Sequence, residues 1–171
     1  MLSPASASTK SALLDRKIEE CAAGLAPAVT KQLFSISKDN AAIIVKYIEV
    51  VKTEVNPADS YRRNIILLLC RFSNYHKNKA FKEISRDDIV KFLDSLRNTE
   101  TIDPMHQWIG TYNLFRVDLM RFFKWLYSPE IEPNKRPKPS IIENIPKLKR
   151  KETSIYKPSD LWTQQDDLLF L

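Results

Sequence analysis

Residues 61–75 read YRRNIILLLCRFSNY, and their large apolar side chains recur at alternating steps of four and three residues. Such steps place apolar side chains on one face of an α-helix. The residues on that face are Tyr61, Ile65, Leu68, Phe72 and Tyr75. Asn56 followed by Pro57 is a typical signal for the start of a helix. We therefore expect a long helix that ends near Tyr75 and turns a strongly apolar face to the core.

The same periodicity predicts four more helices on either side of this stretch. Their approximate ranges are 11–25, 37–55, 85–96 and 111–126. Ser37, Ser85 and Thr111 are suitable N-caps, because a hydroxyl oxygen accepts a hydrogen bond from an amide of the first helical turn. We expect the first of these helices to be peripheral and the others to form the core, and Pro129 to end the last.

The composition favours the same fold class. The chain has 171 residues, 43% of them hydrophobic, which is enough for one domain with a packed core and additional tails. Its only two glycines, Gly24 and Gly110, exclude the glycine-rich phosphate loops of nucleotide-binding proteins. Tight β-hairpins are also disfavoured, because their turns need residues that tolerate a positive φ. The predicted fold class is all-α, as a small helical bundle.

The two cysteines and two histidines do not form a metal-binding pattern. Cys21 and Cys70 lie in apolar helical patterns, where a free cysteine behaves as a small hydrophobe. His76 and His106 lack the spacing of zinc ligands. We expect no metal, no cofactor and no disulfide in this chain. No stretch is apolar enough for a membrane span and residues 1–9 do not resemble a signal peptide, so we expect a cytoplasmic protein without a membrane partner.

The net charge of +6 is concentrated in two blocks. Residues 61–82 contain six cationic residues and no acid, and residues 135–151 contain seven against the single acid Glu143. Such blocks indicate a polyanionic partner. Six of the ten prolines fall within 129–158, so residues 129–160 are predicted to form an extended basic linker. In the remaining residues, 161–171, we expect the start of a short helix capped by Thr163.

Six short motifs occur in an order and spacing that carry a family resemblance. They are Ser60-Tyr61 at the start of the long helix, FKEISRDDIVKFL at 81–93, GTYN at 110–113, LMRFFKWL at 119–126, IPK at 145–147 and LWTQQD at 161–166. From about residue 39 onward the chain resembles the N-terminal core-binding domain of the tyrosine recombinase (phage integrase) family, especially its archaeal members. The fourth motif is the most specific of the six, because it contains two adjacent phenylalanines and ends in tryptophan and leucine.

The resemblance implies a SAM-like, core-binding helical bundle that clamps one face of duplex DNA while a catalytic domain clamps the other. It divides the chain into an N-terminal extension (1–36), the core-binding domain (37–128), the linker (129–160) and the first residues of a catalytic domain (161–171). The family's catalytic arginines, lysine, H-x-x-R motif and nucleophilic tyrosine are not found in these 171 residues. We therefore expect this chain to bind DNA without catalysis, as the nucleoid-associated part of a DNA strand-exchange enzyme that acts with other recombinase protomers.

Matching the chain to this family places the starts of two helices against the duplex. At the first start, Arg62 and Arg63 oppose the helix dipole, which points to another role, and we expect them to contact guanine or phosphate. At the second start the candidates are Thr111, Tyr112, Asn113, Arg116 and Lys124. The Asn113 amide suits adenine, whereas Thr111 is equally well explained as a cap.

Cationic residues outside these helices are candidates for phosphate contacts. They are Lys77, Lys79 and Lys82 after the long helix, and Lys147, Lys149, Arg150 and Lys151 in the linker. Each is also explained by an ordinary solvated surface. Among the aromatic residues of the last helix, we assign Phe122 to the core and leave the role of Trp108 open.

Two other functions fit the same sequence. One is a stand-alone DNA-binding regulator without recombinase activity. The other is a helical adaptor whose basic linker docks on an acidic protein or a membrane surface. Binding to duplex DNA separates the first from the second.

Overall fold

The computed structural model describes residues 4–99, 101–103 and 105–149, and no β-strand occurs among them. The expected all-α class is therefore confirmed. The α-helices are α1 (Pro4–Ala22), α2 (Pro27–Ser35), α3 (Lys38–Val55), α4 (Asp59–Tyr75), α5 (Arg86–Asp94) and α6 (Trp108–Tyr127). Single turns of 3₁₀-helix cover Phe81–Glu83, Pro133–Lys135 and Ser140–Ile142.

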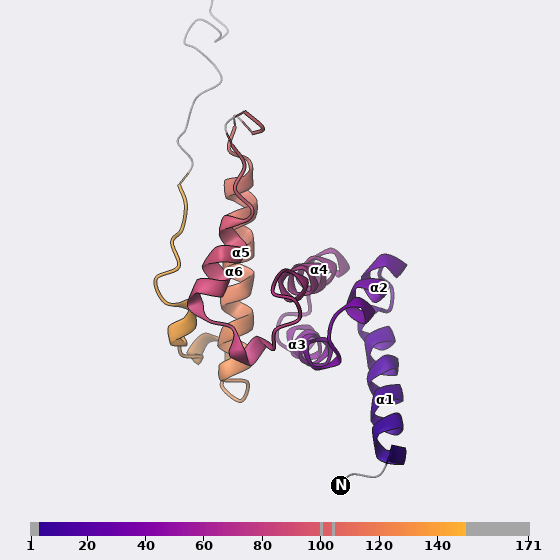
Figure 1. The fold of residues 1–171 in the computed structure, drawn as a ribbon. Coiled ribbons are helices and arrows are strands. Elements are labelled where there is room, and N and C mark those ends of the chain that lie inside the picture. The colour runs from indigo at the N-terminus through magenta and orange to yellow at the C-terminus, as the bar shows by residue number, and fades with distance from the viewer. Residues whose placement is uncertain (1–3, 100, 104, 150–171) are drawn as a thin grey trace, which may run out of the picture.

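Helices α3 and α4 occupy the middle of the molecule, with α1 and α2 on one side and α5 and α6 on the other (Figure 1). In that view α3 and α4 are seen nearly end-on while α6 stands upright, so α6 crosses both at a steep angle. Helix α6 packs against α3, α4 and α5, and α2 packs against α4 on the far side. A single hydrophobic core contains side chains from all six helices.

Helix α6 contributes an aromatic cluster to this core. Phe122 and Phe123 are fully buried, with ring centroids 5.1 Å apart. Phe122 also meets Tyr47 of α3 edge-on at 5.2 Å and Phe81 at 5.0 Å. Phe123 meets Phe72 of α4 edge-on at 6.0 Å. Such pairs contribute about 0.5–1.5 kcal/mol each beyond burial. The assignment of Phe122 to the core is confirmed, and the cluster holds α6 against α3 and α4.

The two cysteines are buried and free, as their apolar contexts predicted. Burial raises the pKa of the Cys21 thiol to about 11 and that of the Cys70 thiol to about 12. The cause is the loss of water around the thiolate, which disfavours the charged form. Both side chains therefore act as small hydrophobic groups between α1 and α4.

The N-terminal 36 residues differ from the single peripheral helix that we expected. They form two helices, and both insert side chains into the core: Ile18 and Cys21 from α1, and Val29 and Leu33 from α2. Helix α2 escaped prediction because it is only nine residues long and begins at Pro27. So short a helix has little propensity of its own and depends on its packing against α4.

Two of the predicted N-caps are confirmed by hydrogen bonds. The Ser37 hydroxyl accepts from the Asn40 amide at 3.3 Å at the start of α3. The Ser85 hydroxyl accepts from the Asp88 amide at 3.2 Å at the start of α5, and the Asp88 carboxylate accepts from the Ser85 amide at 2.9 Å. This reciprocal pair is a capping box, which satisfies two otherwise unpaired amides.

The other two predicted helix starts are wrong. Asn56 ends α3 in the left-handed region, with φ of 45°, and α4 begins three residues later at Asp59. Thr111 does not cap α6, because that helix begins at Trp108 and Thr111 lies within its first turns. The amide of Trp108 donates instead to the carboxylate of Asp103 at 3.0 Å. That acceptor lies in the preceding loop, so local periodicity gave no sign of it.

The segment after α6 packs against the helices, whereas we expected it to be extended throughout. Ile142 is 0% exposed and Ile145 is 4% exposed, and both belong to the core. Arg136 forms a bidentate ion pair with Glu54 of α3. Arg86 of α5 donates to the carbonyls of residues 143 and 144, each at 2.9 Å. The prolines prevent a continuous α-helix here, but the buried isoleucines and these polar contacts fix the path of the chain.

A buried amide connects the middle helices. Asn40 of α3 is 0% exposed and donates to the Ser73 hydroxyl at 2.8 Å and to the Lys79 carbonyl at 3.0 Å. Its oxygen accepts from the amide of Phe81 at 3.3 Å. The Asn78 side-chain oxygen accepts from Ser73 and from the amide of Ser37. These bonds fix the turn after α4 against the start of α3.

The capping box of α5 yields a prediction about stability. A hydrogen bond from Lys79 at 2.8 Å, together with the one from the Ser85 amide, holds the pKa of Asp88 well below its usual value. A depressed carboxyl pKa contributes stability above the pKa of the unfolded chain, near 4, and that contribution is lost as the pH falls toward the lower folded-state pKa. We expect Asp88→Asn to lower the free energy of unfolding by about 1 to 2 kcal/mol near pH 7. The difference from wild type should shrink at about pH 3.

Urea unfolding at the two pH values measures this difference. The matched control is Asp87→Asn, which removes the same charge from the same helical turn at a side chain that is 79% exposed. It should change the free energy of unfolding by less than about 0.5 kcal/mol. Equal losses in the two variants would show that net charge, rather than the cap, sets the effect.

Candidate nucleic-acid interface

The outward face of α4 carries two exposed arginines and a single acid, Asp59, in its first turn. Its exposed residues follow the helical repeat, because steps of three and four return to the same side. They are Asp59, Ser60, Arg63, Asn64, Arg71, Asn74 and Tyr75. Within the described part of the chain, no hydrogen bond or ion pair engages the guanidinium of Arg63 or Arg71. Both charges are therefore available to a ligand.

The outward face of α6 is different in character. Gly110, Leu114, Val117 and Arg121 form one row along the helix, at steps of four, three and four. Leu114 is 52% exposed and Val117 is 38% exposed, which is unusual for large aliphatic side chains in a helix this well packed. Arg121 closes the row and donates to the Tyr61 hydroxyl of α4 at 3.0 Å. This row lies on the side of α6 away from the aromatic cluster.

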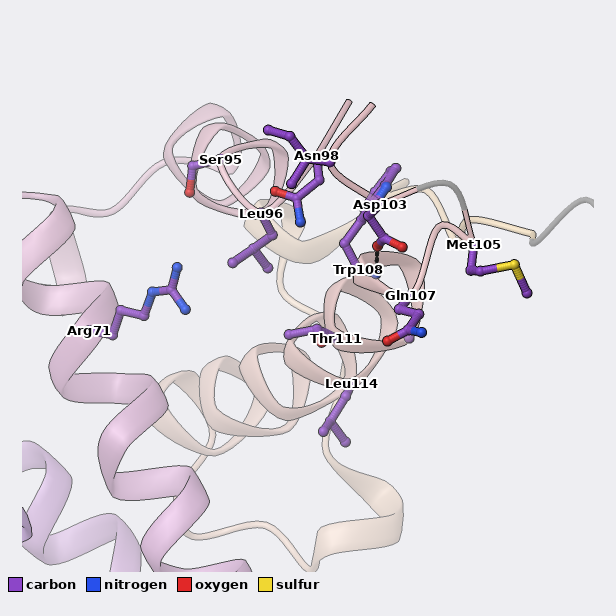
Figure 2. A pocket seen from close by; sticks show the side chains of 12 residues that line it. Arg71, Ser95, Leu96, Asn98, Asp103, Met105, Gln107, Trp108, Thr111 and Leu114 are labelled. Atoms are coloured by element: carbon purple, nitrogen blue, oxygen red, sulfur yellow. Dashed lines mark hydrogen bonds between the residues drawn. The ribbon is translucent and has the colours of Figure 1, made fainter. Parts of the chain in front are cut away.

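A cleft of about 1110 Å³ lies between α4, the end of α5 and the start of α6. Figure 2 shows Arg71 pointing from α4 into the space bounded by Leu96, Thr111 and Leu114. The acid in the lining is Asp103, whose carboxylate accepts from the Trp108 amide, drawn as a dashed line. Hydrogen bonds from backbone amides hold the pKa of Asp103 below its usual value, and the one from Trp108 has the largest effect.

Cation–π contacts and an ion pair connect the loop after α5 to the start of α6, at the edge of the cleft. The Arg97 guanidinium lies over the rings of Trp108 and Tyr112, 5.5 Å and 5.9 Å from their centroids. Arg97 also pairs with Asp94 at 2.8 Å. Trp108 therefore supports the loop and packs partly against the core, which answers the question that the sequence left open.

Arg62, the first of the predicted DNA contacts, is used within the protein. Its guanidinium donates to the Ala23 carbonyl at the end of α1 at 2.7 Å and pairs with Asp59 at 3.1 Å. Only 11% of the side chain is exposed. Arg63, the next residue, points outward because successive helical residues differ in direction by about 100°. Arg62 and Arg63, which we treated as one site, therefore point to different sides of α4.

Three of the candidates on α6 also have roles inside the fold. Tyr112 is 0% exposed, so the expectation that its side chain contacts DNA is corrected. The Asn113 amide donates to the Leu148 carbonyl at 2.8 Å, and its oxygen accepts from the Leu148 amide at 3.1 Å. Arg116 donates to the Ile145 carbonyl at 2.9 Å. Asn113 and Arg116 thus hold the segment after α6 and are not free to pair with bases.

The lysine candidates are dispersed. Lys79 is engaged by Asp88 at 2.8 Å. The other lysine candidates that the structure describes lie outside the lining of the large cleft. Lys77, Lys82, Lys147 and Lys149 are exposed, and Lys124 is half-buried beside Arg121 at a smaller cavity of about 360 Å³. Arg150, Lys151 and the expected helix at 163–171 lie outside the described residues.

Sequence reasoning missed Arg71 as a site residue, although it noted the residue within a basic block. Arg71 lies eight residues after Arg63 and seven after Asn64, and a seven-residue step returns almost to the same side of a helix. That spacing was available in the sequence. The exposed aliphatic pair Leu114 and Val117 was not, since apolar residues in a helix are ordinarily assigned to the core.

The comparisons with known proteins identified no relative: neither a family of known sequences, nor a curated protein, nor a solved structure matched this chain. Among the described helices, none is long and apolar enough to cross a membrane. The described residues also contain no cluster of three or more histidine, cysteine, aspartate or glutamate side chains that would suit a metal ion.

The bidentate contact of Asn113 yields a second prediction. Asn113→Ala leaves both backbone groups of Leu148 without their side-chain partner, so the segment that follows Ile145 should open more readily. We expect amide exchange at Leu148 to accelerate about 10-fold, the effect of losing roughly 1.4 kcal/mol of local hydrogen bonding. Hydrogen–deuterium exchange resolved by NMR measures it.

Asn74→Ala is the control, because Asn74 is an exposed residue of α4 whose side chain makes no contact with this segment. Exchange at Leu148 should not change in that variant. Unaltered exchange in Asn113→Ala would mean that Ile142 and Ile145 hold the segment without help from the amide.

Proposed function

We propose that this chain binds duplex DNA through the outward faces of α4 and α6, as the N-terminal DNA-binding part of a tyrosine recombinase. The observation that carries the proposal is the pair of unengaged arginines, Arg63 and Arg71, on the outward face of α4, where Arg71 lines a large cleft. Cations without internal partners in such a position favour a polyanion. Duplex DNA presents phosphates at regular intervals, which suits charges two helical turns apart.

The width of the major groove of DNA is compatible with the same partner. The major groove of B-DNA is about 12 Å wide and admits an α-helix. Helix α6 offers its outward row for this groove, and the arginines of α4 then lie beside the phosphates that border it. Phosphate contacts of this kind orient a protein on the duplex without reading its sequence.

The sequence motifs supply the finer part of the proposal. The order of the motifs from residue 39 onward resembles the core-binding domain of tyrosine recombinases, and the six-helix bundle is compatible with a domain of that kind. In this proposal the chain holds one face of the duplex. Cutting and rejoining belong to a catalytic domain that would follow, and other protomers of the same protein would bind alongside. The exposed Lys147 and Lys149 then extend the phosphate contacts along the segment that leads to that domain.

Fluorescence anisotropy on labelled duplex DNA over a series of salt concentrations tests the proposal. The logarithm of the binding constant should fall linearly with the logarithm of the salt concentration, with a slope of about −0.9 for each phosphate contact. We expect Arg63→Ala combined with Arg71→Ala to make that slope shallower by about 2 and to weaken binding at least about 10-fold at low salt. Both side chains are exposed, so the variant should keep its fold.

The control is Arg16→Ala combined with Lys31→Ala, which removes the same charge from exposed positions of α1 and α2. It should leave the slope almost unchanged. Equal effects of the two double variants would reduce the binding to general electrostatics. Failure of the unaltered chain to bind at low salt would overturn the proposal in favour of a protein partner.

A further inference from the structure

The outward row of α6 is apolar where a DNA-reading helix is commonly polar. Leu114 and Val117 are two of the most exposed aliphatic residues of α6, at 52% and 38%. They sit between Gly110 at one end of the row and Arg121 at the other. Neighbouring exposed apolar side chains mark contact surfaces, whereas isolated ones are common on any protein. Leu114 itself lines the large cleft.

The side chains near Leu114 and Val117 that could hydrogen-bond with bases are occupied, and Arg121 at the end of the row is engaged by the Tyr61 hydroxyl and by Asp118. Bidentate pairing with adenine or guanine uses asparagine, glutamine, arginine or lysine. On this part of α6 the Asn113 amide is held by both backbone groups of Leu148, and Arg116 is held by the Ile145 carbonyl. What α6 presents instead is the pair of aliphatic side chains, with the methyl-bearing Thr111 beside them.

The major groove offers one apolar group to such a surface. That group is the C5-methyl of thymine, and it distinguishes thymine from the other three bases of DNA. Leu114 and Val117 are three residues apart, which corresponds to a rise of about 4.5 Å along the helix. Successive base pairs are about 3.4 Å apart, so two aliphatic side chains at this spacing can meet the methyl groups of neighbouring pairs.

We propose that α6 recognises thymine C5-methyl groups through Leu114 and Val117, and so favours sites with adjacent A·T pairs. The inference rests on the proposed function, because it requires α6 to enter the major groove. In this inference Leu114 and Val117 discriminate between bases, and the arginines of α4 supply affinity for the phosphates. The two roles are therefore separable by mutation.

Four duplexes of equal length provide the test. One is alternating adenine–thymine, and the second replaces every thymine with uracil, which removes only the methyl group. The third is alternating guanine–cytosine, and the fourth carries 5-methylcytosine, which restores a methyl at the equivalent position. Removal of the methyls should weaken binding about 4-fold for each buried methyl, or about 15-fold for the pair, and methylation of cytosine should strengthen it.

Leu114→Ala combined with Val117→Ala should abolish the difference between thymine and uracil while keeping the salt dependence. The matched control is Leu13→Ala combined with Val55→Ala, which shortens the same two residue types at positions that are 57% and 64% exposed. That control should discriminate as the unaltered chain does.

Equal binding of the thymine and uracil duplexes by the unaltered chain would overturn the inference and leave the proposed function standing. A difference that persists in the Leu114 and Val117 variant would come from duplex shape, and it would overturn the inference as well. Binding to none of the four duplexes would overturn the proposed function and with it the inference.

Discussion

The buried amide of Asn40 is the contact on which the arrangement of the middle helices depends. It pairs with a hydroxyl of α4, a carbonyl in the turn after α4 and the amide of Phe81, and Asn40 itself is 0% exposed. Each of these polar groups would destabilise the folded state by about 1–3 kcal/mol if it were buried without a hydrogen-bond partner. The turn contains two residues with positive φ, Lys77 and Asn78, so the backbone needs such partners to hold its path.

The turn after α4 also positions α5 and α6, the two helices that follow it. Lys79 reaches the capping box of α5, and Phe81 inserts into the aromatic cluster of α6. A displaced turn would therefore move α5 and α6 relative to α4. The large cleft lies among these three helices, so a displaced turn would also change its shape.

The protein divides its arginines between structure and surface. Arg62, Arg86 and Arg116 each donate to backbone carbonyls, and they tie α1 or the segment after α6 to the bundle. Arg136 ties the same segment to α3 through its ion pair with Glu54. Arg63 and Arg71 make no such contact and remain on the outward face of α4. The planar guanidinium, with five donors, serves both purposes, so the residue type alone does not distinguish them.

The sequence by itself determined five of the six α-helices, the caps at Ser37 and Ser85, and the burial of Phe122, Cys21 and Cys70. These features follow from periodicity and from contacts within one turn, which local sequence contains. Only the tertiary structure decided that Arg62, Tyr112, Asn113 and Arg116 turn inward, that α2 forms, and that Ile142 and Ile145 join the core. Each of those outcomes depends on a partner that is distant in sequence: Ala23 for Arg62, Leu148 for Asn113, and α4 for α2. Long-range partners leave no periodic trace, so a cation that faces a carbonyl and one that faces solvent look the same in the sequence.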